Sequence, residues 1–180
     1  MNYIVFDLEW NQPVDGKSSK DRKLLFEIIE IGAVKLDEDG HKIAEFSETI
    51  KPQVYSKLNY HIQKMLGISM NELKRSGTFP QVYKRFLKWC GDDVIFCTWG
   101  TQDLTELQRN MNYYKLEPLS SGPLMFYNIQ SIYSDLIGGE DKAYNLEAAV
   151  DSLGLQKDIP FHRAYADAYY TAKIMTLMNK

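Results

Sequence analysis

The sequence has few cysteines, no long apolar run and no excess of positive charge. Its two cysteines, Cys90 and Cys97, match no zinc-ligand spacing and lie in apolar surroundings, so we expect reduced thiols in the core. No apolar stretch approaches the roughly 20 residues that cross a bilayer, and the N-terminus lacks a basic region followed by an apolar signal core. We therefore expect a cytoplasmic protein with no membrane partner.

The formal net charge of −3 excludes a global positive field that would attract a polyanion. Nucleic acid would have to be attracted by bound metal ions or by local basic patches. One such patch is the loop at 17–23, and another is formed by Lys84, Arg85 and Lys88 on one predicted helix. Ordinary solvated side chains are the simpler interpretation of both groups.

Hydrophobic periodicity predicts one α/β domain over residues 1–180, a length that supports a sizeable core. The first three strands should form an antiparallel meander, and alternating strands and helices follow. We therefore expect a central mixed sheet of five strands flanked by α-helices. The predicted strands cover 3–9, 26–37, 42–51, 92–98 and 124–128, and the predicted helices cover 59–66, a short segment opened by Ser69, 80–90, 101–114, 129–137, 145–153 and 163–178.

The first predicted strand ends in two carboxylates, in the stretch YIVFDLEW. Side chains two residues apart on a strand point to the same face, so Asp7 and Glu9 should project together. Two like charges at short range repel each other unless a cation lies between them. Their oxygens suit Mg²⁺ or Mn²⁺, whereas the alternative is a pair of acids that face solvent at the strand end.

Three other residues have a structural explanation when each is taken alone. Asp103, just beyond the fourth predicted strand, suits a helix N-cap with Glu106 completing a capping box. Asp167 suits the first turn of the last helix, where the helix dipole favours an acid. His162 precedes Asp167 by five residues, and a single histidine is more often structural or solvated.

Taken together, these residues resemble the motifs of the DEDD exonuclease superfamily. FDLEW matches the first motif, WGTQDL the second and FHRAYADA the third. The stretches IIEIGAVKLD, LGISMNEL and NLEAAVDSLGL also resemble segments of that family, so the resemblance covers nearly the whole chain. It implies the RNase H-like fold of DnaQ-like exonucleases.

The spacing of the third motif indicates the subclass. A histidine five residues before the last aspartate is the DEDDh pattern, whereas the DEDDy pattern has a tyrosine where Arg163 stands here. The second motif and the FDLEW opening are also similar to the ERI-1-like and KapD-like RNA-processing branch.

This resemblance implies a metal-dependent 3′–5′ exonuclease that releases nucleoside monophosphates from the 3′ end of single-stranded RNA or DNA. The implied cofactors are two divalent ions, Mg²⁺ or Mn²⁺, held by Asp7, Glu9, Asp103 and Asp167, with Asp7 bridging both. The implied general base is His162, because a neutral imidazole accepts a proton near pH 7.

The resemblance also implies contacts to the terminal nucleotide. Aromatic stacking on a base suits Trp10, although a core or rim position is the alternative. Trp10 and Asn11 depart from the small hydroxyl residues that many family members carry here, which leaves the substrate details open. The implied substrate-binding residues are Leu8, Trp10, His61, Leu66, Gly67 and Ile68; for Ile68 and His61 the alternatives are a core and a surface role.

Three other functions stay open at this point. The first is a catalytically weak or inactive nucleic-acid-binding or regulatory module on the same fold, and the complete set of four acids and a histidine disfavours it. The second is an RNase H-type endonuclease, which the histidine spacing disfavours. The third is a structural or regulatory partner protein. The sequence leaves the choice between RNA and DNA and the oligomeric state undetermined.

Overall fold

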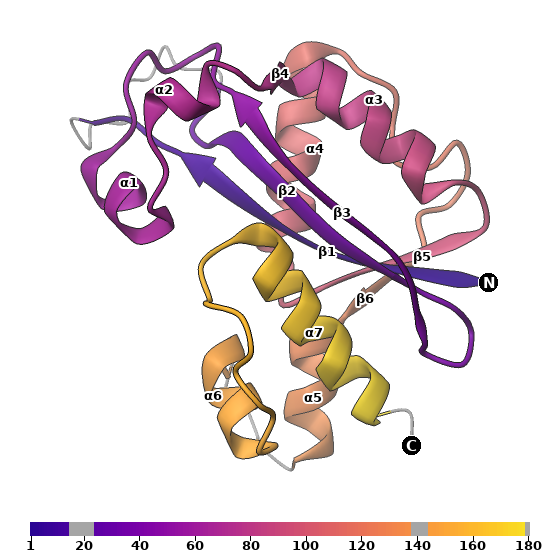
Figure 1. Ribbon diagram of the computed structural model, residues 1–180. Coiled ribbons are helices and arrows are strands. Elements are labelled where there is room, and N and C mark those ends of the chain that lie inside the picture. The colour runs from indigo at the N-terminus through magenta and orange to yellow at the C-terminus, as the bar shows by residue number, and fades with distance from the viewer. Residues whose placement is uncertain (15–23, 138–143, 179–180) are drawn as a thin grey trace.

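The computed structural model describes residues 1–14, 24–137 and 144–178 (Figure 1). The strands are β1 Asn2–Asn11, β2 Glu27–Leu36, β3 Lys42–Lys51, β4 Gly77–Thr78, β5 Val94–Thr98 and β6 Phe126–Asn128. The helices are α1 Tyr60–Leu66, α2 Met70–Leu73, α3 Phe79–Cys90, α4 Gln102–Tyr114, α5 Ile129–Leu136, α6 Leu146–Ser152 and α7 Ala164–Met178.

The strands form one mixed sheet with the order β4-β3-β2-β1-β5-β6. The three N-terminal strands pair antiparallel, and β5 and β6 add to β1 in parallel. The predicted meander, α/β class and five strands are confirmed. The sixth strand, β4, was not predicted, because its two residues are too few to show an alternating pattern.

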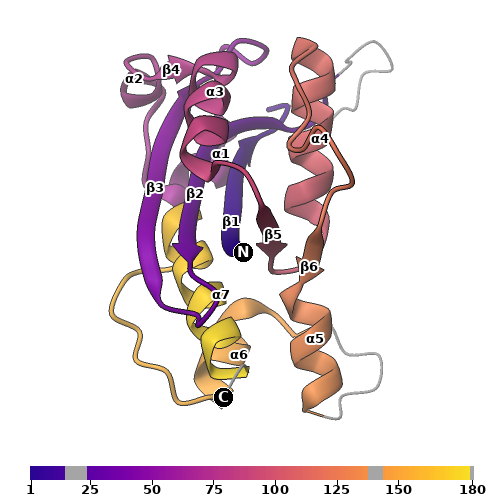
Figure 2. The ribbon, with the colours of Figure 1, turned by 90° about the vertical axis from the view of Figure 1, so that its right-hand side faces the viewer.

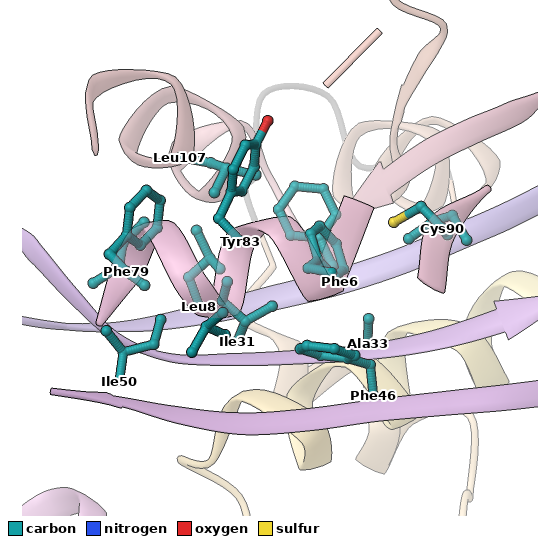
Figure 3. Packing of buried hydrophobic residues seen from close by; sticks show 14 of the residues in the cluster. Phe6, Leu8, Ile31, Ala33, Phe46, Ile50, Phe79, Tyr83, Cys90 and Leu107 are labelled. Atoms are coloured by element: carbon teal, nitrogen blue, oxygen red, sulfur yellow. The ribbon is translucent and has the colours of Figure 1, made fainter. Parts of the chain in front are cut away.

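Helices cover both faces of the sheet, as Figures 1 and 2 show from two directions. One face packs against α3 and α4, and the other packs against α5, α6 and α7. Strand β1 serves both layers because its side chains alternate. Ile4, Phe6 and Leu8 are buried on the α3 and α4 side, where Figure 3 shows Phe6 and Leu8 among the side chains of that core, and Val5 is buried on the α7 side.

The N-terminus of α7 lies directly on strand β2. At Gly32 an added Cβ would lie 2.0 Å from the backbone nitrogen of Tyr165, so only glycine allows this approach. Gly32 is the register partner of Asp7 on β1. The glycine therefore lets the first turn of α7, which carries Asp167, reach the end of β1 that carries Asp7 and Glu9.

The predicted helix boundaries agree with the structure to within one or two residues. Ser69 and Glu72 form the predicted capping box, and Pro80 lies in the first turn of α3. The predicted basic loop at 17–23 lies outside the described residues. Within the described ranges, no helix combines the length and apolar character that crossing a membrane requires.

Candidate active site

Three carboxylates converge where β1 meets the first turn of α7. Asp7 and Glu9 project from alternate positions of β1, and Asp167 reaches them from the helix. One oxygen of each lies within 4.8 Å of the others. The predicted pairing of the two β1 acids and their meeting with Asp167 are thus seen in the structure.

Asp103 reaches the same strand from its other edge. The pairing of β1 with β5 ends at Val5, which leaves the next backbone groups of β1 without a strand partner on that side. The backbone N–H of Leu8 donates to Oδ1 of Asp103 at 3.0 Å. Asp103 lies in the first turn of α4, whose N-cap is Thr101, so the capping-box interpretation of Asp103 is wrong.

The four acids repel one another in the absence of a cation. Burial and the charges of Asp103, Asp167 and Glu9 raise the pKa of Asp7 well above its usual range. Burial and neighbouring acids raise the pKa of Glu9 to about 8. Burial likewise raises the pKa of Asp103 to about 7 and that of Asp167 to about 6. Such shifts concentrate at functional sites, because a scaffold gains nothing from crowding unneutralised carboxylates.

The donor set fits hard divalent cations. Carboxylate oxygens are the ligands that Mg²⁺ and Mn²⁺ prefer, and a dication would relieve the repulsion that raises these pKa values. The hairpin residues Asp37, Asp39 and His41 also lie close enough to share an ion. There, however, hydrogen bonds from the backbone of His41 and Asp39 already stabilise the Asp37 charge and lower its pKa. Among the residues that the structure describes, no backbone N–H gives Asp7 or Glu9 this compensation.

His162 lies in the turn before α7, as predicted. Its backbone φ of 65° is in the left-handed region, and its side chain is exposed. Its backbone N–H points at Oδ1 of Asp167 at 3.4 Å, and its charge lowers the pKa of Asp167. The turn therefore holds the histidine beside the acid cluster with an imidazole open to solvent.

One charged pair at this site, Glu30 and Arg163, was not predicted from the sequence. Glu30 on β2 is the register partner of Glu9, is 1% exposed, and binds Arg163, the residue after His162. The signal was present in the stretch IIEIGAV, where Glu30 is the one charged residue in an otherwise apolar run. A buried acid in such a run needs a cationic partner, and the sequence alone could not show that Arg163 supplies it.

The predicted nucleotide-contact segment lies at the end of α1. Leu66 and Ile68 are 5% and 6% exposed and pack into a small hydrophobic cluster with Ile29. Gly67 is exposed, with a φ of 63° that ends the helix. A groove of about 440 Å³ runs over this segment and includes Tyr60 in its lining. The accessible surface of this segment is therefore formed mainly by its backbone and by Tyr60, and the two buried aliphatic side chains contribute little to it.

The other predicted substrate contacts are placed as follows. The Leu8 side chain is 3% exposed in the core, so only its backbone faces the acids. Trp10 is partly buried, with its ring 5.7 Å from that of Phe26. His61 is exposed in the first turn of α1. Their contact roles stay predictions.

Asn11 explains why the chain departs from the family pattern after Glu9. It is fully buried, donates to the carbonyl of Lys57 at 2.9 Å and accepts from the N–H of Asn59 at 2.9 Å. The amide supplies a separate donor nitrogen and acceptor oxygen for these two bonds. Asn11 thereby ties the end of β1 to the segment that leads into α1.

The predicted basic patch on α3 is exposed but partly neutralised. Arg85 donates to both carboxylate oxygens of Glu48 on β3. Lys84 and Lys88 remain exposed on the same helix. Two of the three charges are therefore free of that pairing.

Comparison with known proteins agrees with this geometry. The family model RNase_T, described as exonuclease, matches residues 4–175. The chain belongs to this family, the DEDDh 3′–5′ exonucleases. The fold, the nuclease activity class and the DEDDh subclass were thus predicted correctly from the motifs.

Individual relatives are distant. The chain is 23% identical to rat 3′-5′ exoribonuclease 1 over 167 residues, which are 87% of this chain and 48% of that protein. It is 25% identical to the DNA polymerase III subunit epsilon of Aquifex aeolicus over 173 residues, 96% of this chain and 77% of that subunit. The chain spans about half the length of the exoribonuclease it matches.

The fold is shared with a solved nuclease domain. The structure of the nuclease domain of 3′hExo, a DEDDh family member bound to rAMP, superposes with a TM-score of 0.85. It covers 99% of this chain and 91% of that domain at 21% identity. At this identity the likeness establishes the fold alone.

Proposed function

We propose that this protein is a metal-dependent 3′–5′ exonuclease that releases nucleoside monophosphates from single-stranded 3′ ends. The observation that carries the proposal is the convergence of Asp7, Glu9 and Asp167, with Asp103 beside them. Membership of the exonuclease family supports it. An inactive binding module would have no use for four mutually repelling acids.

Asp7, Glu9, Asp103 and Asp167 would hold two divalent cations, Mg²⁺ or Mn²⁺, whose preference for carboxylate oxygens this donor set fits. When bound, such ions stabilise the negative charge that develops on the attacking and leaving oxygens of an in-line displacement. Each of the four acids is held in position by a rigid part of the fold. Asp7 and Glu9 are fixed by the sheet, Asp103 by its hydrogen bond from Leu8, and Asp167 by the packing of α7 on Gly32.

His162 acts as the general base in this proposal. It accepts the proton of the water that attacks the terminal phosphodiester, and the leaving 3′ oxygen departs in line. Its exposed imidazole beside Asp167 supports this role.

The substrate is a single-stranded RNA or DNA end. We keep both RNA and DNA because the similar proteins include both kinds. The nuclease domain of 3′hExo was solved with rAMP, whereas the epsilon subunit belongs to a DNA polymerase. The groove over the α1 segment, with Tyr60 69% exposed, suits a terminal nucleotide whose base stacks on an aromatic ring.

Degradation of 5′-labelled single-stranded RNA and DNA tests the proposal. With Mn²⁺ we expect stepwise shortening from the 3′ end and nucleoside monophosphate products, and EDTA should stop both. Labelled material that binds without shortening would contradict an exonuclease and favour the binding module. Cleavage confined to the interior of RNA–DNA hybrids would favour an RNase H-type endonuclease.

The base is tested by His162→Ala with His41→Ala as its control. We expect His162→Ala to lower kcat by about 10²- to 10⁴-fold, the usual contribution of a general base, with the melting temperature unchanged. His41 is exposed on the distant β2–β3 hairpin, so its replacement should leave kcat unchanged. Single-turnover rates near wild type in His162→Ala would contradict the assignment.

A further inference from the structure

The buried carboxylate of Glu30 forms a two-point contact with Arg163. Nε of Arg163 donates to Oε2 of Glu30 at 2.9 Å, and one terminal nitrogen donates to Oε1 at 2.9 Å. The side chain of Glu30 is 2% exposed and that of Arg163 is 44% exposed. The planar guanidinium matches the carboxylate plane, so the contact fixes orientation as well as distance.

The pair joins the middle of the sheet to the turn that carries His162. Glu30 lies opposite Glu9 on the neighbouring strand, and Arg163 follows His162 directly. The contact therefore sets where the turn lies relative to the strand that carries the acids. It is formed between residues 133 positions apart, so no local sequence preference produces it.

The turn needs such a contact because His162 holds an uncommon backbone conformation. A residue other than glycine with φ near 65° persists when its surroundings hold it there. On the N-terminal side, Phe161 stacks on Tyr170 at 4.4 Å, and the Tyr170 hydroxyl bonds both backbone groups of Ile159. Arg163 is the anchor on the other side.

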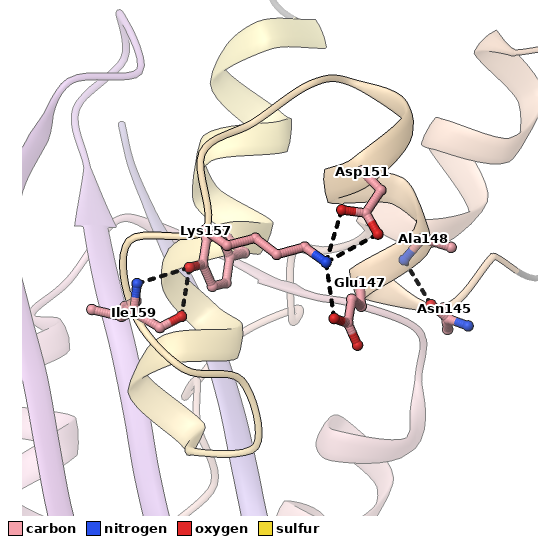
Figure 4. Close-up of polar contacts among 7 residues, drawn as sticks. Asn145, Glu147, Ala148, Asp151, Lys157 and Ile159 are labelled. Carbon is pink, nitrogen blue, oxygen red and sulfur yellow. Dashed lines mark hydrogen bonds and ion pairs between the residues drawn. The ribbon is translucent and has the colours of Figure 1, made fainter.

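Further back along the same connection, a lysine anchors the chain to α6. Lys157 contacts Glu147 and Asp151, and Figure 4 shows these contacts beside the bonds of Ile159. The imidazole of His162, by contrast, makes no hydrogen bond to any other residue that the structure describes. Its position therefore depends on the backbone that its neighbours hold.

We propose that Arg163, held by Glu30, is a positioning residue that places the imidazole of His162 against the acid cluster. The inference rests on the proposed function, since it assigns a role in the same reaction. The pair acts through geometry: the two-point contact defines the turn, and charge alone does not replace it. A displacement of the base by about 1 Å is enough to lower turnover by about 10²-fold.

The chain offers a matched pair with which to separate positioning from general stabilisation. Arg85 makes the same type of two-point contact with Glu48 through Nε and a terminal nitrogen. That pair joins α3 to β3, on the opposite face of the sheet from α7. Glu48→Gln is therefore the control for Glu30→Gln.

The experiment compares Glu30→Gln, Arg163→Lys and Glu48→Gln in the full chain. For the first two we expect kcat on labelled single-stranded RNA with Mn²⁺ to fall by about 10-fold or more, with KM within about two-fold of wild type. Arg163→Lys keeps the positive charge but cannot make the two-point contact of a guanidinium, so we expect its kcat to fall despite the retained charge. Glu48→Gln should leave kcat unchanged.

A second readout is independent of turnover. The chain has three histidines, so ¹³C-labelled histidine gives an imidazole spectrum in which His162 is assignable by its loss in His162→Ala. We expect Glu30→Gln and Arg163→Lys to shift or broaden the His162 signal while those of His41 and His61 stay in place. Glu48→Gln should move none of the three.

The outcomes separate the positioning role from the proposed function. Wild-type kcat in Arg163→Lys, or a kcat loss in Glu48→Gln as large as that in Glu30→Gln, would overturn the positioning role and leave the exonuclease intact. An unmoved His162 signal in both variants would also overturn it. If the wild-type protein degrades no substrate, the proposed function fails, and the His162 signal alone decides the positioning role.

Discussion

The two faces of strand β1 differ in kind: one carries apolar side chains and the other carries acids. On the α3 and α4 side, Ile4, Phe6 and Leu8 are 0–3% exposed and pack into an apolar core. On the α7 side, Val5 continues the core, but Asp7 and Glu9 follow it with pKa values raised by burial and by neighbouring carboxylates. One face stabilises the fold and the other holds charge that the fold does not neutralise.

This difference teaches how the site is built. The apolar face fixes β1 in the sheet, and the fixed strand then holds the acids in place despite their repulsion. In the metal-free protein, ionising these acids costs free energy because they repel one another. A bound cation removes that repulsion, and the relief adds to the free energy of cation binding. Substitutions on the two faces should therefore act on different measurements.

The largest effect is expected on the acidic face. Asp7→Asn removes the central carboxylate, and we expect the degradation rate with Mn²⁺ to fall by about 10³-fold or more. Initial rates on labelled single-stranded RNA measure this. Asp37→Asn, in the exposed hairpin, is the control and should retain the wild-type rate. Comparable rates in Asp7→Asn and Asp37→Asn would show that activity depends no more on the β1 acids than on the hairpin acids.

The contact between α7 and the sheet should be next in size. Gly32→Ala forces a Cβ against the backbone of Tyr165, so we expect a loss of about 3 kcal/mol in the free energy of unfolding and a displaced Asp167. Urea denaturation and the degradation rate measure the two effects. At Gly122 an added Cβ meets no atom within 4 Å, so Gly122→Ala is the matched control. Equal stability of the two variants would show that α7 does not pack on Gly32 in this way.

The pH dependence of stability tests the unneutralised charge. In the folded protein Glu9 has a pKa of about 8 and Asp103 one of about 7, both above the values of the unfolded chain. The folded state therefore binds more protons in this range, and its stability is lost as the pH rises through these pKa values. In EDTA we expect the free energy of unfolding to fall by about 2 kcal/mol or more between pH 5 and pH 8.

Mn²⁺ and Asp7→Asn provide the controls for that measurement. Saturating Mn²⁺ should restore stability at pH 8, because it binds the ionised acids of the folded state. Asp7→Asn should flatten the pH dependence in EDTA and make the metal-free protein more stable at pH 8. A stability that rises from pH 5 to pH 8 in EDTA would contradict the repulsion that the structure indicates.

The smallest effect is expected on the apolar face. Ile4→Val removes one buried methylene and should cost about 1 kcal/mol in the free energy of unfolding. It should leave kcat unchanged, because Ile4 faces away from the acids. Chemical denaturation and initial rates measure both quantities. A drop in kcat without a drop in stability would show that the two faces are not independent.

The sequence predicted the elements and the acid set well because both leave local signals. A continuous apolar run places β1, caps and glycines mark the helices, and the motifs around Asp7, Asp103 and Asp167 are short. The Glu30–Arg163 contact, the approach of α7 at Gly32 and the two bonds of Asn11 were not predictable in this way. Each depends on residues far apart in the chain, which only the folded backbone brings together.

The most direct test of the central claim is anomalous diffraction from crystals soaked in MnCl₂ and AMP. The account predicts two Mn²⁺ ions, with Asp7 between them and with Glu9, Asp103 and Asp167 as the remaining protein ligands. Clear density for AMP with no manganese among these four side chains would contradict it.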